Sequence, residues 1–401
     1  MGPEAKKEYV KAMRERYGRM GRQGRTLLLN EFCAMMGCHR KSAIRCLNGP
    51  EGTAAKRPGP KAQYGEAELR VLKEIWLAAE QPCGKRLKGT VELWLPAYEK
   101  RWPVSPGVKK RLIKMSSSTM DRLLKPVRAR QRRKGLGGTK PGSLLKTQIP
   151  IRAESWNEDR PGYMEADTVS HGGETSAGES VWSLTFTDIW SGWTENAAVW
   201  NKGAAGVKER LRMMEEKLAF ELLGFDCDNG SEFLNHHLWS YLREREKPVL
   251  FTRSRPYRKN DQAHVEQKNW THVRQLVGYD RFENRALVEP LNDLYEKWGL
   301  LHNYFCPTMK LKAKSREGAK VKRSYEEPKT PYRRLMESPH VKEEKKKELK
   351  KVMKGLDPFT LKAQIEAQLR RIHSLNRGTE STIRVCSTTL TAQFAPGNTF
   401  P

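Results

Sequence analysis

Apolar residues recur every three to four positions in the first part of the chain, which is the spacing of one face of a helix. The repeat consists of Leu28, Leu29, Phe32 and Met36, and it resumes after Gly37 with Ala43, Ile44 and Leu47. Glycine at the break permits the backbone angles of a tight turn. Residues 8–47 are therefore predicted to contain two helices joined at Gly37, the arrangement of a helix-turn-helix.

The second predicted helix, from His39 to Leu47, has a polar and basic face. Side chains of this kind reach phosphates and guanine edges in the major groove of DNA. We expect residues 1–48 to form a DNA-binding domain that contacts DNA through Arg40, Lys41, Ser42 and Arg45. The alternative is an ordinary helical hairpin with a solvated basic face.

A second helical region follows residues 49–64, which are rich in Gly, Pro and basic residues and are predicted to be a linker. Apolar spacing predicts helix over residues 66–102, and a second helix-turn-helix pattern ends in a helix capped by Ser116 or Ser117 that stops before Pro126. We expect residues 65–126 to form a second DNA-binding domain with contacts from Ser118 and Arg122. The alternative is one helical domain without base contacts. Residues 127–148, basic and glycine-rich, are predicted to be another linker.

The pattern changes to alternating strands and helices over residues 149–305. Three strand patterns come first, and helix, strand, helix, strand and helix patterns follow, the last over residues 261–277. This is the order of a mixed α/β sheet of the ribonuclease-H-like kind. The expected fold is therefore multidomain, with all-α modules before an α/β core.

Residues 306–401 form a basic C-terminal region. The stretch from residue 310 to 335 is expected to be partly extended and to contact DNA. Two helices are predicted after it, the second opening on an Asp357 cap with Pro358 in its first turn. Contacts between protomers are hypothesised for apolar residues that recur at helical spacing, namely Leu361, Ile365, Leu369 and Ile372.

The charge of the chain narrows the choice of partner. Lys and Arg number 75 against 47 Asp and Glu, which leaves a net charge of +28 in 401 residues. A polyanion explains this balance, and nucleic acid is favoured over a membrane surface. No apolar run approaches the ~18 residues of a membrane span. The cysteines are scattered without a CxxC pair, which indicates a reducing compartment, and Cys33, Cys38, His39 and Cys46 match no zinc-finger spacing.

Three motifs in the α/β region carry acidic residues: EADTV around Asp167, DCDNGSEF around Asp228, and RPYRKNDQAHVEQKN around Glu266. Carboxylates from distant segments that converge in a fold are suitable ligands for two hard cations in phosphodiester chemistry. On this basis we expect Asp167 to bridge two metal ions, while Asp228 and Glu266 each complete one site.

These motifs resemble the retroviral-integrase-type core of bacterial insertion-sequence transposases, and the interval between Asp228 and Glu266 is close to the spacing of such cores. The resemblance implies a DDE transposase or integrase with Mg²⁺ as cofactor and Mn²⁺ as a substitute. It also implies that DNA, as element ends and target, is the partner, bound by a homo-multimer. The expected location is the bacterial cytoplasm, at the nucleoid.

Other acidic residues are ranked below this triad. Strand alternation places Glu165 on the face of Asp167 and Asp226 on the face of Asp228, so either could contribute to metal binding. Asp188 is expected to be exposed or at a sheet edge. His236 and His237 are expected to be surface or packing residues.

The segment that leads into the Glu266 helix is expected to hold the scissile strand, because it is basic and carries an aromatic residue. Its expected DNA contacts are Arg253, Arg255, Arg258, Lys259 and Asn260. Helical steps place Gln262, Asn269, Trp270 and Val273 on the face of Glu266. Many relatives in the resembled family carry a basic residue at the position of Val273, so Lys268 or Arg274 is expected to take that role.

Two functions other than transposition remain open from the sequence. One is a catalytically silent DNA-binding regulator derived from a transposase, and the intact carboxylate motifs argue against it. The other is a ribonuclease-H-type nuclease, which has little use for two DNA-reading modules.

Overall fold

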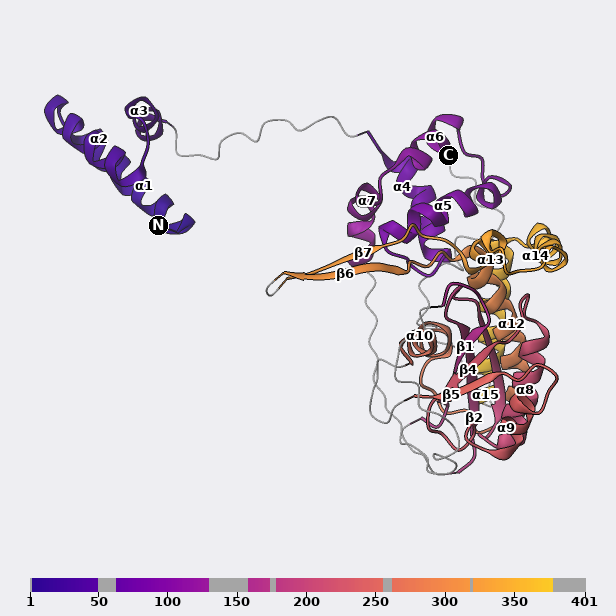
Figure 1. The fold of residues 1–401 in the computed structure, drawn as a ribbon. Helices are drawn as coiled ribbons and strands as arrows, with labels where there is room; N and C mark the ends of the chain where they lie inside the picture. Colours follow the sequence, from indigo (N-terminus) through magenta and orange to yellow (C-terminus); the bar gives the residue numbers. More distant parts are fainter. Residues whose placement is uncertain are drawn as a thin grey trace. The chain divides into compact units, whose positions relative to one another are not determined.

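The computed structural model describes residues 2–49, 63–129, 158–173, 178–254, 262–317 and 320–377. The chain divides into two compact units, Met1–Gln63 and Tyr64–Pro401 (Figure 1). None of the helices in the described part of the chain combines the length and the apolar character that a membrane crossing requires.

The first unit is a small bundle of three helices. They are α1 (Pro3–Arg19), α2 (Arg22–Met36) and α3 (Arg40–Asn48). Both helices expected from the apolar spacing are present, and α1 packs on them around a core that includes Met13, Phe32 and Leu47. Gly37 ends α2 at φ +58°, a left-handed conformation that glycine adopts without strain. His39 caps α3, since its side chain accepts a hydrogen bond from the Lys41 amide.

Four helices open the second unit: α4 (Glu66–Ala78), α5 (Gly84–Glu99), α6 (Pro106–Lys114) and α7 (Ser117–Ala129). The helical segment expected over residues 66–102 is thus two helices, separated where Glu80 and Gln81 adopt positive φ angles. Ser116 caps α7 as expected, because its Oγ accepts a hydrogen bond from the Thr119 amide at 3.2 Å.

Helix α7 does not stop before Pro126, as the sequence predicted, but continues to Ala129. Proline inside a helix removes one backbone hydrogen bond, so the last turn needs stabilisation from elsewhere. Arg128 supplies it: its guanidinium pairs with Asp121 at 2.7 Å and lies over the Trp76 ring at 5.5 Å from the centroid. The contact with Trp76 joins α7 to α4 and is therefore not visible in the local sequence.

A five-stranded mixed sheet forms the centre of the unit, as predicted. Its strands are β1 (Tyr163–Ser170), β2 (Val181–Asp188), β3 (Thr194–Trp200), β4 (Gly224–Cys227) and β5 (Leu250–Arg253). Their order is β3-β2-β1-β4-β5, antiparallel between the first three and parallel between β1, β4 and β5. The parallel pairs are connected through α8 (Ala204–Glu216) and α9 (His236–Arg243), because parallel strands need a crossover.

The edge of the sheet at β3 is covered by α12 (Val288–Phe305). Asn292 and Asn303 of this helix bond to the backbone of the edge strand. The amide of Ala198 donates to Asn292 at 2.8 Å, and that of Thr194 donates to Asn303 at 3.0 Å. An unpaired strand edge can pair with another chain. The side chains of Asn292 and Asn303 prevent this by taking up the free backbone groups of β3.

Between β5 and α12 the chain forms α10 (Ala263–Lys268), a π-helical turn η2 (Asn269–Arg274), α11 (Gln275–Val277) and a 3₁₀ turn η3 (Arg285–Leu287). The single helix expected over residues 261–277 is therefore interrupted by a π-helical turn. Such turns are frequent at functional sites.

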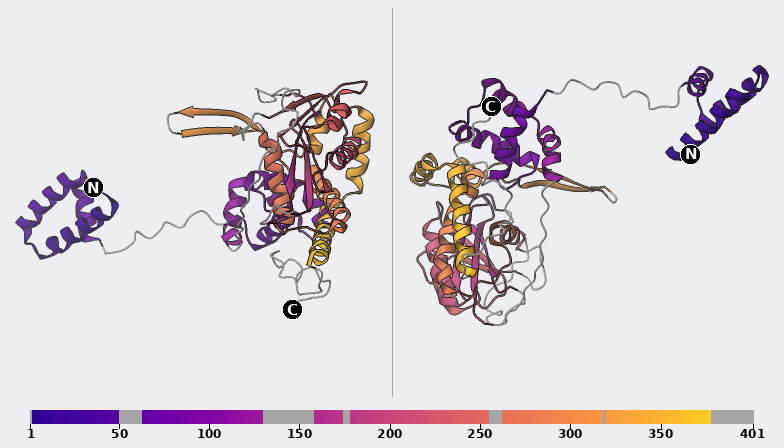
Figure 2. Two further views of the ribbon diagram at one scale, coloured as in Figure 1. Left: turned by 90° about the horizontal axis from the view of Figure 1, so that it is seen from below. Right: turned by 180° about the vertical axis from the view of Figure 1, so that it is seen from behind.

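After α12 the chain forms the hairpin β6 (Leu311–Glu317) and β7 (Lys320–Tyr325), followed by α13 (Pro331–Glu337), α14 (Glu343–Gly355) and α15 (Pro358–Arg377). The stretch expected to be partly extended is this hairpin, which projects from the unit in both views of Figure 2. The two expected C-terminal helices are present. Asp357 caps α15 by accepting a hydrogen bond from the Thr360 amide at 2.9 Å.

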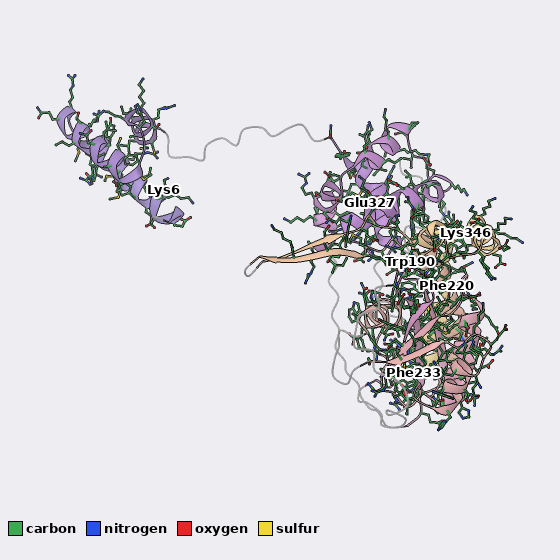
Figure 3. All side chains as sticks on the ribbon, in the orientation of Figure 1. Lys6, Trp190, Phe220, Phe233, Glu327 and Lys346 are labelled. Carbon is green, nitrogen blue, oxygen red and sulfur yellow. The ribbon has the colours of Figure 1, made fainter. Side chains whose placement is uncertain are left out.

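The apolar face of α15 packs inside its own chain, which corrects the hypothesis of contacts between protomers. Ile365 and Ile372 are fully buried, and Leu361 is nearly so. Phe359 on the same helix meets Trp94 of α5 edge to face at 5.1 Å between ring centroids. One apolar core thus extends from α4 to α15, with Phe233 of the sheet region among its members (Figure 3). The segments on either side of the domain boundaries expected near residues 126 and 305 pack together.

Candidate active site

Asp167 lies towards the end of β1, the central strand of the sheet. Two donors fix its carboxylate: the Asn269 side-chain amide at 2.6 Å and the Thr168 backbone amide at 2.7 Å. Asn269 is the first residue of η2, so the π-helical turn and β1 meet at this carboxylate.

Asp228 follows directly after β4. Ala166 of β1 and Cys227 of β4 are register partners in the parallel ladder, and their successors are Asp167 and Asp228. The turn after β4 folds back on Asp228, whose Oδ1 accepts a hydrogen bond from the Gly230 amide at 2.8 Å. A Cβ at Gly230 would lie 2.8 Å from that same oxygen and 2.6 Å from the Glu232 carboxylate, so a larger residue here would displace both carboxylates.

Glu266 is an exposed residue on the single helical turn of α10. Its charge acts on Asp167. Burial raises the pKa of Asp167 to about 8, the negative charge of Asp228 adds to this increase, and smaller contributions come from Glu232 and Glu266. Burial likewise raises the pKa of Asp228, and the charge of Glu232 adds to that increase. The structure therefore places Asp167 and Asp228 on neighbouring strands next to a further carboxylate, Glu232, with Glu266 within electrostatic reach of Asp167.

The fourth carboxylate, Glu232, was not among the residues expected from the sequence. It is 4 % exposed, and its Oε1 accepts a hydrogen bond from the Thr168 hydroxyl at 2.8 Å. Its Oε2 is buried without a hydrogen-bond partner, and the Lys202 ammonium lies 3.7 Å away. A carboxylate oxygen left in this state is costly unless a cation approaches it. Its place in the DNGSEF motif was the available signal.

The donor set fits a hard divalent cation, because it consists of carboxylate oxygens and one of them, Oε2 of Glu232, is buried without a hydrogen-bond donor. Among the described residues, no three His, Cys, Asp or Glu side chains are placed close enough to hold one ion together. Glu266 is the exposed member of the cluster, so its side chain has the freedom to complete such a set.

Glu165 and Asp226 lie on the same face of the sheet, as strand alternation predicts, but they engage structural partners. The two residues are register partners on β1 and β4, and both are buried. Glu165 accepts a hydrogen bond from the Val265 amide at 2.9 Å, which anchors α10 to the sheet. Asp226 accepts one from the Thr252 hydroxyl at 2.6 Å.

No family model matches the chain. Uncharacterized protein y4rM of Sinorhizobium fredii is 38 % identical over 335 residues, which are 82 % of this chain and 94 % of that protein. The chain belongs to the y4rM family.

Two solved structures resemble part of this y4rM-family chain. The catalytic core domain of BIV integrase matches with 16 % identity and a TM-score of 0.28, over 43 % of the chain and 91 % of that domain. The HTLV-2 integrase catalytic core domain in complex with magnesium matches with 14 % identity and a TM-score of 0.28, over 37 % of the chain and 90 % of that domain. Likeness this distant carries no argument about activity.

The residues expected to contact DNA from the helical regions are exposed. On α3 these are Arg40, Lys41, Ser42 and Arg45, and on α7 they are Ser118 and Arg122. His236 and His237 are also exposed, at the start of α9. Arg255, Arg258, Lys259 and Asn260 lie outside the described residues.

Three other expected DNA contacts are directed into the protein. Arg253 is buried and donates to the Asn229 side chain at 2.8 Å. Lys268 donates to the Gly192 carbonyl at 3.2 Å, and burial lowers its pKa to about 7. The Arg274 guanidinium lies over the Tyr279 ring at 4.8 Å from the centroid.

The π-helical turn also changes the face that was expected around Glu266. Its wider repeat breaks the three-, four- and seven-residue steps of an α-helix. Val273 is fully buried rather than beside the exposed Glu266, whereas Trp270 is 45 % exposed and Asn269 points to Asp167.

Asp188 is fully buried at the end of β2, which is an inner strand, so the expectation of an exposed or edge position was wrong. Its carboxylate accepts hydrogen bonds from the Gly162 amide at 2.8 Å, the Ser191 amide at 2.6 Å and the Ser191 hydroxyl at 2.5 Å. Burial raises the pKa of Asp188 to about 6. The residue organises the turn between β2 and β3.

Proposed function

We propose that this y4rM-family chain is a DNA transposase or integrase that binds the ends of a mobile element and catalyses metal-dependent strand cleavage and strand transfer. The observation that supports the proposal is the position of Asp167 on β1 next to Asp228, which follows the neighbouring strand β4, with the charges of Asp228 and Glu266 among those that raise the pKa of Asp167. The motifs around these residues supply the reaction class.

In this proposal the carboxylates hold Mg²⁺, for which Mn²⁺ can substitute. Asp167 would be shared between two ions, with Asp228 and Glu266 each completing one site. When bound, such ions activate a water or 3′-hydroxyl and stabilise the leaving oxygen. The surrounding residues prepare the site: Asn269 and Thr168 orient Asp167, while Glu165 fixes the start of α10 and thereby the position of Glu266.

DNA recognition is assigned to the helical regions. We interpret α2 and α3, joined at Gly37, as a helix-turn-helix with the exposed residues of α3 facing DNA. We interpret α6 and α7 in the same way, with Ser118 and Arg122 exposed. The net charge of +28 supports a polyanionic partner. Strand transfer joins two DNA ends to a target, so we propose a homo-multimer on DNA.

The alternative is a catalytically silent DNA-binding regulator. The discriminating experiment is strand transfer of an oligonucleotide from the DNA that flanks the coding sequence, in Mg²⁺, by wild type, Asp228→Asn and the control Asp293→Asn. Asp293 is exposed on α12, away from the carboxylates. We expect joining by wild type and control and none by Asp228→Asn, with equal binding in gel shifts. Binding without joining by all three proteins would favour the regulator, and cleavage without joining would favour a nuclease.

A further inference from the structure

The hairpin β6–β7 is the most basic element of the second unit that the carboxylate site does not use. It projects from the body of the unit in Figures 1 and 2. Its sequence from residue 310 to 325 has one acidic residue, Glu317, against seven basic ones: Lys310, Lys312, Lys314, Arg316, Lys320, Lys322 and Arg323.

The described apolar side chains at the base of the hairpin do not form a core, because Leu311 is 50 % and Tyr325 41 % exposed. A two-stranded ribbon without a third strand or a packed face is marginal in water. The described side chains of Lys312, Ser315, Lys322 and Arg323 are exposed as well. A polyanion bound along the ribbon would neutralise this exposed positive charge.

The base of the hairpin is anchored firmly to the sheet unit. Arg334 of α13 is buried and donates to the Thr308 hydroxyl at 2.7 Å, to the Thr308 carbonyl at 2.9 Å and to the Ser191 carbonyl at 3.3 Å. The Lys310 ammonium lies 5.2 Å from the centroid of the Trp190 ring. Trp190 and Glu327 line the same hollow at this base, where Figure 3 labels both. The ribbon is therefore mounted in a fixed direction.

We propose that the β6–β7 hairpin inserts into the major groove of duplex DNA and grips the phosphates on both sides. That groove is about 12 Å wide and admits a two-stranded β-ribbon. Basic side chains along both strands then neutralise phosphates without reading sequence. The inference rests on the proposed function in taking DNA as the partner, and it adds a third DNA-binding element to the two helical regions.

The test compares the triple variant Lys312→Gln/Lys322→Gln/Arg323→Gln with a matched control on α14, Lys347→Gln/Lys350→Gln/Lys351→Gln. Both sets consist of three exposed basic residues of the full chain. Each lost phosphate contact lowers the slope of log binding constant against log salt by about 0.9. We expect the slope to fall by up to about three such steps in the hairpin variant and to be unchanged in the control.

Dimethyl sulfate footprinting on the same DNA tests the groove, because it modifies guanine N7 in the major groove. We expect wild type and the α14 control to protect guanine N7 from modification, and the hairpin variant to lose this protection. Equal salt slopes in the two variants, protection that persists in the hairpin variant, or stronger hairpin-dependent binding to RNA than to duplex DNA would each overturn the inference. These results would leave joining by wild type intact, so they are distinguishable from failure of the proposed function, in which wild type joins no DNA.

Discussion

Two donors hold the Asp167 carboxylate, the Thr168 amide and the Asn269 side chain. The surroundings of this carboxylate nevertheless disfavour its negatively charged form. Burial and the neighbouring carboxylates raise its pKa to about 8. A cation bound among these oxygens would lower the pKa of Asp167, because a nearby positive charge favours the ionised carboxylate. The residue is therefore both a structural contact of η2 and the most sensitive reporter of ion binding.

This shift predicts a pH dependence of metal stabilisation. Because the folded pKa of about 8 lies above the unfolded value of 3.8, the contribution of Asp167 to stability is present below pH ~4 and is lost as the pH rises through 8. Mg²⁺ must displace the proton, so it should raise the melting temperature more at pH 9 than at pH 6. Differential scanning fluorimetry of wild type and Asp167→Asn measures this. Equal stabilisation at both pH values in wild type would contradict it.

The buried Asp188 gives a second prediction at the residue scale. Asp188→Ala leaves the Gly162 and Ser191 amides without their acceptor inside the protein. We expect the free energy of unfolding to fall by about 2–4 kcal/mol. Urea denaturation checks this, with exposed Asp293→Ala as the control that changes it little. Loss of stability in the control alone would refute the structural role.

At the scale of elements, two consecutive residues of η2 point in different directions. Asn269 donates to Asp167, whereas Trp270, four residues after Glu266 in the chain, is half-exposed. An exposed aromatic ring next to a carboxylate site is suited to stacking on a base of the bound strand. Among the described residues from 262 to 277, Trp270 presents an exposed ring, whereas Lys268 and Arg274 contact Gly192 and Tyr279.

Trp270→Ala should therefore weaken binding of single-stranded or frayed DNA ends by about 1–3 kcal/mol without lowering the melting temperature. Fluorescence anisotropy with a labelled end oligonucleotide measures the affinity. Leu375→Ala, which removes another exposed apolar side chain on α15, is the control. An unchanged affinity in Trp270→Ala would remove the stacking role.

Periodicity predicted the strands and most helices because burial of one face imposes a repeat on the local sequence. It failed where contacts beyond the apolar repeat decide the structure. Arg128 stabilises the turn beyond Pro126 through Trp76 of α4 and Asp121 of its own helix, and the π-helical turn moves Val273 into the core. Glu232 escaped prediction for another reason, because its place beside Asp228 depends on the conformation of the local turn at Gly230, which periodicity does not describe.

At the scale of the whole molecule, the chain has one unit of three helices and one unit that carries the sheet. Each unit has an apolar core of its own. Under the proposed function, the first unit contributes one of the two DNA-reading helix pairs, and the second unit carries the other pair together with the carboxylates. Composition predicted the polyanionic partner, but not that residues 64–401 pack as one unit, because that depends on contacts such as Trp94 with Phe359.

Residues 64–401 should consequently fold without the first unit and should keep metal-dependent joining. Their preference for element ends over unrelated DNA should decrease, because α3 is absent. Thermal denaturation and competition gel shifts test both parts. A truncated chain that does not fold, or that keeps the full preference, would contradict the division of roles.

The central claim is that Asp167, Asp228 and Glu266 act as one metal-holding group. The most direct measurement is the joining rate in Mg²⁺ for Asp167→Asn, Asp228→Asn, Glu266→Gln and the triple variant, each with DNA binding matched to wild type. Residues that act as a unit are non-additive. The account predicts that each single change abolishes joining and that the triple variant is no worse than any of them. A single variant that joins DNA at the wild-type rate would contradict it.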